Sequence, residues 1–438
     1  MELAELEKRI ARQFASSIAR MEGAISASHL CRRRDVGTGQ IIRPARGSVL
    51  ASPVIADWNP EPDYFFHWLR DSAIVMRTVA ELMEQAADES DRQRWSGHFE
   101  DFVEFSLKLN GLDGRALPAQ RGSRVRPGAS DKFLRADSEL NALVGDALLA
   151  EPRFNPDGTI DVFRWSRPQY DGPALRALAC LCFLAAGGTS SEDILRLLRG
   201  DLDFTIRHAG RPGIGPWEES DQNGSHYYVE LVQLAALIRG RSWANDAADR
   251  LTLAEQKLRD DLEQYWSERH QVLAAMRPAA AQSPDDMVDA ATLLAVWDAD
   301  LSDGPHSVLD SRVRKTQEAI EGLFAREFPI NRTHAGAPVL GRSRGDRYFG
   351  GGAWYPTTLA AAGLCYRGAR LCPHARQGNV ARGDAFMATL LQFTPADGSL
   401  SEQIDRTTGA QSSARHLTWS YAAFISTARE RRRALALL

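Results

Sequence analysis

Apolar residues recur at helical spacing in twelve separate segments of this 438-residue chain, whereas strand-like alternation is scarce and short. The first segment runs from Leu3 to Met21, with charged residues between its apolar positions. The others are expected near residues 68–85, 91–109, 173–186, 192–208, 225–238, 245–265, 284–297, 312–328, 353–370, 381–393 and 414–434. A chain with this pattern buries its apolar surface by packing helix against helix.

Two of these segments carry start signals. Ser283, Pro284 and Asp286 have the spacing of an N-cap, a first helical proline and an acidic third residue. Ser190 and Asp193 form a second pair with capping-box spacing. We therefore expect one helix to begin at Pro284 and another shortly after Ser190.

The helices are not separated by Pro/Ser-rich linkers or organised in a recognisable repeat. An all-α chain of this kind is more economical as one closed toroid of helical hairpins than as separate bundles. We predict that residues 1–438 form a single domain. The long stretch 111–172, with one short helix expected at 138–149, is interpreted as a functional loop at one end of the toroid.

Charge and composition exclude several functions. The net charge is −4, and basic residues alternate with acidic ones, so neither nucleic acid nor a membrane surface is an expected partner. No apolar run approaches the roughly 20 residues that span a bilayer. The first segment is an amphipathic helix rather than a secretory signal, and we expect a cytoplasmic protein. No His/Cys/Asp/Glu group has ligand spacing, so neither a metal nor a cofactor is expected.

Four loop-to-helix junctions combine aromatic residues, a carboxylate and often an arginine. They are "PDYFFHWLRDSAIVMR" from Pro62, "FRWSRPQYDGPALRALA" from Phe163, "GPWEESDQNGSHYYVE" from Gly215 and "PADGSLSEQIDRTTGAQSSARHLTWSYAA" from Pro395. Aromatic faces stack on the CH faces of a sugar ring, and charged side chains bind its hydroxyls in pairs. These junctions therefore indicate a sugar ligand.

The four junctions resemble signature segments of the glucoamylase family, glycoside hydrolase family 15, and follow that family's order. Two further segments are similar to family segments, "EPRFNPDG" from Glu151 and "GRSRGDRYFGGGAWY" from Gly341. The resemblance implies an (α/α)6 barrel with a funnel-shaped pocket. It also implies inverting hydrolysis of an α-glucosidic bond at the non-reducing end, with Glu218 as general acid and Glu402 as general base.

The same resemblance implies a set of substrate-binding residues. Arg70 and Asp71 match the pair that grips hydroxyls of the terminal glucose. Trp68 matches a tryptophan of the pocket wall, and Tyr64 matches a tyrosine near the attacking water and the base. Glu219 matches a substrate ligand rather than a second catalyst.

Further matches surround the acid and the second sugar. Trp165 and Arg167 match residues that flank the acid and contact sugar. Arg342, Tyr348 and Trp354 match residues around the second sugar site.

The chemistry of the residues agrees with these roles. Inversion needs a protonated carboxyl beside the leaving oxygen and an ionised one about 6.5–9.5 Å away that activates water. Glu218 and Glu402 meet this condition only if two hairpin ends face one cavity. Trp217 beside the acid, and the like charge of Glu219, would favour the protonated form of Glu218. Gly215 is a departure, since many family members carry an acidic residue there.

The substrate class is expected to be narrow. No starch-binding module and no N-terminal β-sandwich domain is expected, which favours short maltooligosaccharides, isomaltose-type α-1,6 glucosides or trehalose over starch granules. The three glycines at 350–352 would open the second sugar site and favour α-1,6 linkage slightly. Two other functions remain: a glucosyltransferase, and a catalytically silent glycan-binding or regulatory module.

Overall fold

The computed structural model describes residues 2–34, 40–58, 60–117, 133–244, 247–277, 283–333 and 336–438. Helices dominate these ranges, and each strand in them is two or three residues long. None of the helices described combines the length and apolar character needed to cross a bilayer.

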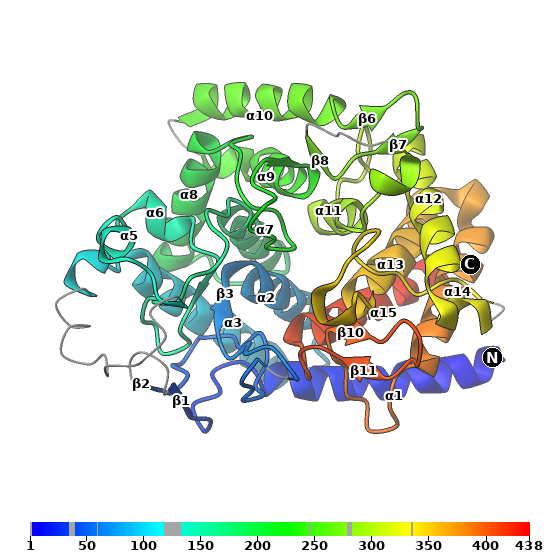
Figure 1. Ribbon diagram of the computed structural model, residues 1–438, viewed down its shortest axis with the longest axis horizontal. Helices are drawn as coiled ribbons and strands as arrows, with labels where there is room; N and C mark the ends of the chain where they lie inside the picture. Colours follow the sequence, from blue (N-terminus) through cyan, green and yellow to red (C-terminus); the bar gives the residue numbers. More distant parts are fainter. Residues whose placement is uncertain are drawn as a thin grey trace.

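Six helices form an inner ring. They are α2 (Leu69–Glu84), α7 (Gly172–Ala185), α9 (Tyr227–Gly240), α11 (Ala291–Ala299), α13 (Tyr355–Leu371) and α15 (Thr418–Leu435). Each packs against the next in this order, and α15 packs against α2, so the ring is closed (Figure 1).

Six more helices surround this ring. They are α1 (Leu3–Glu22), α3 (Glu89–Asn110), α8 (Glu192–Arg207), α10 (Ala248–Glu263), α12 (Ser311–Glu327) and α14 (Arg376–Gln392). Helix α3 packs against α2, α8 against α7, α10 against α9, α12 against α11, α14 against α13 and α1 against α15. Inner and outer helices alternate along the chain, which confirms the predicted (α/α)6 barrel.

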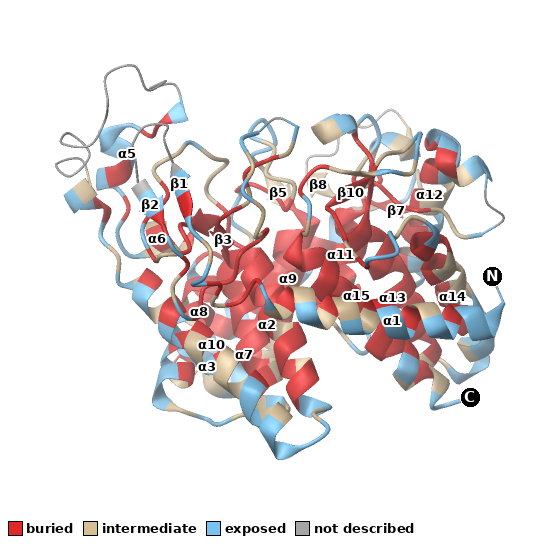
Figure 2. Ribbon diagram, turned by 90° about the horizontal axis from the view of Figure 1, so that it is seen from below, coloured by how far each residue is buried: buried red, intermediate tan, exposed pale blue. Residues whose placement is uncertain are grey.

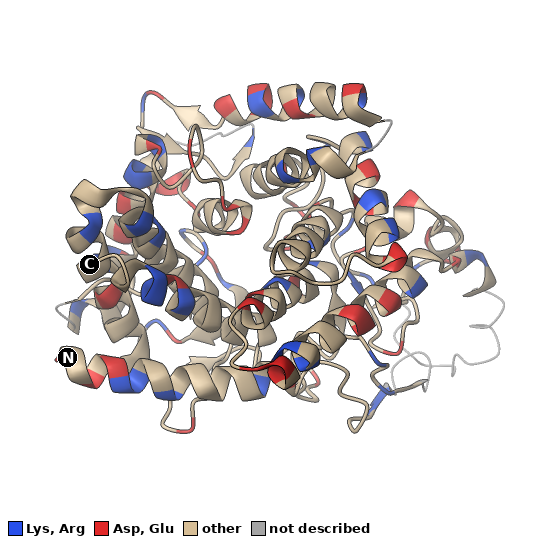
Figure 3. Cartoon of the chain, turned by 180° about the vertical axis from the view of Figure 1, so that it is seen from behind, with Lys and Arg blue, Asp and Glu red and all other residues tan. Residues whose placement is uncertain are grey.

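Burial separates the two rings. Inner helices are buried on nearly all sides, as expected for apolar segments such as "TLAAAGLCY" in α13. Outer helices have one buried and one exposed face, and Figure 2 shows the exposed residues towards the outside of the molecule. Charged residues follow the outer faces, most clearly along α10 at the top of Figure 3. The amphipathic segments of the sequence at 3–21 and 192–208 are therefore outer helices, α1 and α8.

The predicted start of α11 is wrong. Pro284–Asp286 is a 3-10 turn, η5, and the helix begins at Ala291. The Ser283 hydroxyl donates to the Asp286 carboxyl at 2.7 Å, so this pair of side chains satisfies itself instead of capping a helix. Asp289, the residue before the N-cap Ala290, binds the start of the helix instead, since its Oδ1 accepts from the backbone N of Ala291 at 2.7 Å.

Smaller differences concern other boundaries. Ser191, not Ser190, is the N-cap of α8, because its hydroxyl accepts from the backbone N of Ile194 at 3.3 Å. The predicted helix start at residue 245 lies outside the described residues, and α10 begins at Ala248. The short helix expected at 138–149 is two helices, α5 (Asp137–Asn141) and α6 (Asp146–Leu149), and residues 118–132 of the long loop lie outside the description.

Short antiparallel strands fix the loops that precede three inner helices. β3 (His67–Trp68), just before α2, pairs with β4 (Arg153–Phe154). β5 (Ser225–His226), before α9, pairs with β8 (Met276–Arg277). β9 (Ala353–Trp354), before α13, pairs with β10 (Gln403–Ile404), which also pairs with β11 (Gln411–Ser412). Backbone pairing therefore holds the segments that precede the inner helices in fixed positions.

The two remaining strand pairs are local hairpins. β1 (Arg32–Arg34) pairs with β2 (Gln40–Ile42), and β6 (Trp266–Ser267) pairs with β7 (Val272–Leu273). Both lie outside the ring of inner helices (Figure 1).

Candidate active site

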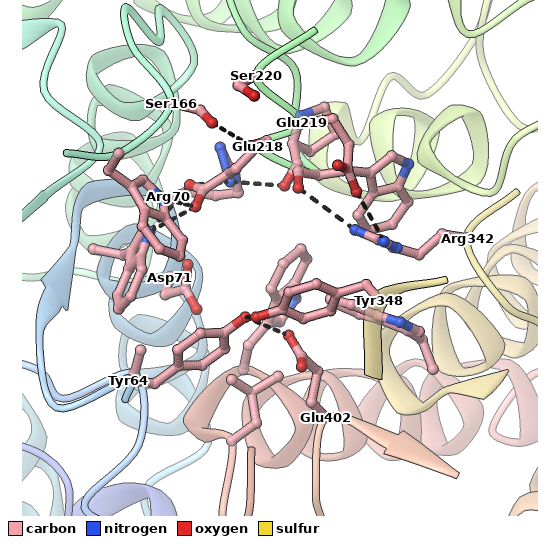
Figure 4. A pocket seen from close by; sticks show the side chains of 18 of the residues that line it. Tyr64, Arg70, Asp71, Ser166, Glu218, Glu219, Ser220, Arg342, Tyr348 and Glu402 are labelled. Atoms are coloured by element: carbon pink, nitrogen blue, oxygen red, sulfur yellow. Dashed lines mark hydrogen bonds and ion pairs between the residues drawn. The ribbon is translucent and has the colours of Figure 1, made fainter. Parts of the chain in front are cut away.

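A cavity of about 400 Å³ opens at the end of the barrel where the inner helices begin. Segments that precede α2, α7, α9, α13 and α15 contribute its walls. Of the thirteen residues predicted for the site, twelve line this cavity, and only Arg167 does not. Figure 4 shows Glu218 and Glu402 on opposite sides of the space. The sequence motifs therefore converge on one place.

Nitrogen donors surround the Glu218 carboxyl. Oε1 accepts from Trp68 Nε1 at 3.0 Å, from Gln169 Nε2 at 3.0 Å and from Arg70 Nη1 at 3.3 Å. Oε2 accepts from Trp165 Nε1. Indole, amide and guanidinium N–H groups donate and do not accept hydrogen bonds. None of these four partners can therefore take a proton from Glu218.

The backbone also holds Glu218 in place. Its φ is +61°, in the left-handed region that non-glycine residues rarely adopt. The backbone N–H of Glu218 donates to the carbonyl of Gly215 at 3.1 Å, and the hydroxyl of Ser166 donates to the backbone carbonyl of Glu218. Such outliers persist only where the surrounding contacts impose them, and they gather at functional sites.

The residues beside Glu218 differ from the sequence-based interpretation. The Trp217 indole N–H donates to both oxygens of Asp289, at 2.8 and 2.9 Å. Glu219 forms an ion pair with Arg342 at 3.0 Å. Both neighbours are thus engaged with other residues, and the contacts of Glu218 come mainly from the segments around Trp68 and Trp165.

Gly215 has a steric reason to depart from the family pattern. A Cβ at this position would lie 2.4 Å from Nδ1 of His226. An acidic side chain there would require His226, which is buried in front of α9, to move.

Hydroxyl groups surround the Glu402 carboxyl. Tyr64 donates its hydroxyl to Oε1 at 3.1 Å and also contacts the Tyr348 hydroxyl at 2.7 Å. The Ser413 hydroxyl donates to Oε2. Burial raises the pKa of Glu402 to about 7, while the Ser413 hydrogen bond and the positive charge of Arg342 act in the opposite direction. Glu402 is a group that changes charge near neutral pH.

Protein contacts occupy most of the Arg70 guanidinium. Its Nε donates to Asp171 at 2.7 Å, Nη1 to the Pro216 carbonyl at 3.0 Å and to Glu218 at 3.3 Å, and Nη2 to Gln169 at 2.5 Å. A guanidinium carries five N–H groups, so at most one of them remains for a sugar hydroxyl once these four contacts are made. Arg70 mainly fixes the loop that carries Glu218.

Asp71 differs from Arg70 in its hydrogen-bond contacts. Its side chain lines the cavity, and no other residue in the described ranges donates a hydrogen bond to its carboxyl. Burial raises its pKa to about 7, and the charge of Arg70 opposes that shift. Its oxygens are therefore the acceptors available to a sugar hydroxyl beside Arg70.

Aromatic rings and one arginine form the wall beside Glu219. The guanidinium carbon of Arg342 lies 5.6 Å from the ring centre of Trp217, 5.1 Å from that of Tyr348 and 5.6 Å from that of Trp354. Trp217 and Trp354 contact each other edge to face at 5.2 Å. Arg342 is fixed by Asp346. This wall therefore places a charged donor between apolar aromatic faces.

The prediction that Arg167 contacts the sugar is not supported by its position. Its Nε donates to Glu151 at 2.7 Å and its Nη1 to the backbone carbonyl of Trp165 at 2.9 Å. The guanidinium thus supports the Trp165 segment from behind.

Three residues that contact the predicted site residues directly were not themselves predicted. Gln169 and Ser413 lie inside the motifs "RPQYDG" and "QSSARH", so a search of every polar residue in those motifs would have found them. Asp289 lies outside the motifs. Its sequence signal is an acidic residue directly before the apolar run that contains the N-cap Ala290 and helix α11.

Among the described residues, no group of three or more His, Cys, Asp or Glu side chains could hold a metal ion.

A barrel with two carboxyls facing each other across a sugar-sized pocket defines the class of the protein, because this pair is what most glycoside hydrolases use. A family model described as "Glycosyl hydrolases family 15" matches residues 26–111 and 135–429. The chain belongs to this family and is a glucoamylase-like glycoside hydrolase.

Curated relatives and solved structures agree with this membership. Glucoamylase-1 of Schizophyllum commune is 28% identical over 88% of this chain and 69% of its own length. The glucoamylase of Blastobotrys adeninivorans is 26% identical over 87% of this chain and 67% of its own length. The structure of the glucoamylase from Saccharomycopsis fibuligera superposes with a TM-score of 0.77 at 23% identity, covering 99% of this chain and 96% of that one.

Proposed function

We propose that the protein hydrolyses α-glucosidic bonds at the non-reducing ends of short α-1,4- or α-1,6-linked glucooligosaccharides and releases β-glucose. The observation that supports this most strongly is the pair of carboxyls, Glu218 and Glu402, which face each other in contrasting surroundings (Figure 4). One is contacted only by nitrogen donors and the other by hydroxyls.

Glu218 acts as the general acid. A proton on this carboxyl finds no acceptor among its four nitrogen partners, so it is directed towards the pocket and the glycosidic oxygen. The proton passes to that oxygen as the bond from the sugar C1 to it breaks. The same N–H groups then stabilise the carboxylate that remains.

Glu402 acts as the general base. In its ionised form it accepts a proton from a water on the opposite side of the ring, while the water oxygen bonds to C1. Tyr64 and Ser413 donate to the two oxygens of Glu402 and so favour the ionised form. Attack from the side opposite the leaving group inverts the anomeric centre.

Cleavage from chain ends follows from the polar groups at Arg70 and Asp71. Asp71 accepts from hydroxyls of the terminal glucose, and Arg70 keeps the loop before α9 in place. A further sugar on those hydroxyls would leave a buried carboxyl without donors, and such a mismatch discriminates by about 10⁴ or more.

The glycines at 350–352 do not support a preference for α-1,6 linkage. A Cβ at Gly351 would lie 1.9 Å from the Asp346 carbonyl oxygen, and one at Gly352 would lie 2.4 Å from that of Ile404. Backbone packing therefore requires these two glycines, and only Gly350 has open space around it. The proposal accordingly covers both linkages.

A substrate panel tests the function. The purified protein is incubated with maltose, isomaltose, panose and trehalose, and glucose is measured enzymatically, with the Glu218→Gln variant as a control for contaminating activity. We expect glucose from maltose or isomaltose in the wild type only. Glucosyl transfer products in place of glucose, or no turnover of any α-glucoside, would contradict the proposal.

A further inference from the structure

Trp58 is an exposed aromatic residue next to the pocket that the mechanism does not use. Its side chain is 45% exposed, although indole rings are usually buried. It is not among the lining residues of the cavity. Its ring centre lies 5.5 Å from that of Trp165, with 41° between the ring planes. Trp165 lines the cavity, so Trp58 contacts a residue of the cavity wall without being part of that wall.

Trp58 extends an aromatic wall that begins inside the pocket. Tyr64 contacts Trp68 at 5.1 Å between ring centres, Trp68 contacts Trp165 at 6.0 Å, and Trp165 contacts Trp58. Both inner tryptophans donate to the Glu218 carboxyl. The wall therefore leads from the acid, where the scissile bond lies in the proposed mechanism, to the outside.

The loop that carries Trp58 is held by a buried arginine. Arg32 is 7% exposed, and its Nη2 donates to the Ala56 carbonyl at 2.7 Å, to Asp57 at 2.9 Å and to Asp63 at 3.3 Å. Trp58 itself has a φ of +67°. Left-handed backbone is costly for a bulky residue and persists where the surroundings impose it. The segment just before Trp58 is thus anchored at Ala56 and Asp57, and the indole itself is exposed.

We propose that Trp58 is a sugar-binding platform for the glucose units beyond the second, so that it determines the preference of the enzyme for chain length. This inference rests on the proposed function, since it assumes that the reducing end of an α-linked glucan leaves the pocket along this wall. An exposed indole at the exit offers a flat apolar face for the CH groups of a glucose ring. A disaccharide is too short to reach it.

Kinetics on two chain lengths test the platform. kcat/KM is measured for maltose and maltotetraose, or for isomaltose and isomaltotetraose if the α-1,6 series is cleaved faster. Trp58→Ala should lower kcat/KM for the tetrasaccharide about 3- to 10-fold, mainly through KM, and change the disaccharide less than about 2-fold. Trp58→Phe, which keeps a ring, should recover most of the loss. Leu253→Ala, which removes a 72% exposed apolar side chain from α10, is the control and should change neither substrate.

A binding measurement separates this inference from the proposed function. Calorimetric titration of maltotetraose into the Glu402→Gln variant, with and without Trp58→Ala, needs no turnover, and the second substitution should raise Kd by about 3- to 10-fold. An unchanged Kd, or equal losses for both chain lengths, would overturn the platform. A change in sedimentation without a change in Kd would also overturn it, because the indole would then be a contact between copies of the chain. A wild type that binds maltotetraose through Trp58 without cleaving it would refute the proposed function alone.

Discussion

Removal of the Ser413 hydroxyl should move the pH dependence of the enzyme in a defined direction. This hydroxyl donates to Oε2 of Glu402, the proposed base. Burial already raises the pKa of Glu402 to about 7, and the Ser413 hydrogen bond opposes that rise. The base must be ionised to work, so kcat/KM should fall as the pH drops below about 7. In Ser413→Ala the ionised form loses a donor, and its pKa should rise further.

The size of the shift follows from the strength of the lost bond. A hydrogen bond to a charged acceptor contributes about 1.5–3 kcal/mol. Since about 1.4 kcal/mol corresponds to one pH unit, the acid limb should move upwards by roughly one to two units. At pH 6 the kcat/KM of the variant should then be about 10- to 100-fold lower than that of the wild type. In alkaline solution the two kcat/KM values should converge.

The assay is a pH profile of kcat/KM from about pH 5 to pH 10 for both proteins. Ser412→Ala is a matched control, because the neighbouring Ser412 hydroxyl is buried without a hydrogen-bond partner in the described structure. The control should keep the acid limb of the wild type. If Ser413→Ala also kept it, or lost activity equally at every pH, Glu402 would not be the group that sets this limb.

Four other results are expected. Glu218→Gln and Glu402→Gln should each lower kcat by about 10²–10⁴-fold with unchanged circular dichroism, and near-normal turnover in either would exclude that residue as acid or base. Asp289→Ala removes the acceptor of the Trp217 indole and of the backbone N–H of Ala291 at the start of α11. It should lower Tm and reduce kcat/KM about tenfold, whereas Asp289→Asn should lose less. Asp71→Asn should lower kcat/KM by about 10²-fold or more, and a smaller loss would show that Asp71 does not hold the terminal glucose. The pKa of Asp71 is raised to about 7 in the folded protein, so the stability contributed by its protonated carboxyl is present at pH 4 and is lost as the pH rises through 7. Melting curves should show that Asp71→Asn gains stability relative to the wild type over that range.

Much of the fold can be predicted from the sequence because helical periodicity is a local property. The apolar positions of α2 and α15 mark buried faces whatever the helices pack against. The start of α11 is not predictable in this way. Ser283 and Asp289 both precede this segment, and either residue type can bind the first turn of a helix. Ser283 bonds to the Asp286 side chain instead, whereas Asp289 bonds to the backbone N of Ala291.

The candidate site is also predictable only in part from the sequence. The motifs predict Glu218 and Glu402 as the acid and the base, and the structure brings both residues to one cavity. The distribution of hydrogen bonds cannot be read from them, since it depends on distances between separate loops. Arg70 looks like a sugar ligand in the sequence and is mostly occupied by Asp171, Gln169 and backbone in the structure.

The stereochemistry of the first product tests the central claim most directly. If Glu402 activates a water across the ring from Glu218, the glucose released from an α-linked substrate must be the β-anomer. Proton NMR during the first minutes, before mutarotation, distinguishes the two anomeric protons. We predict that the β-anomer appears first and the α-anomer grows in later at the rate of mutarotation. An initial α-anomer would mean a covalent intermediate on a carboxyl and would contradict the assignment of Glu402 as a base acting through water.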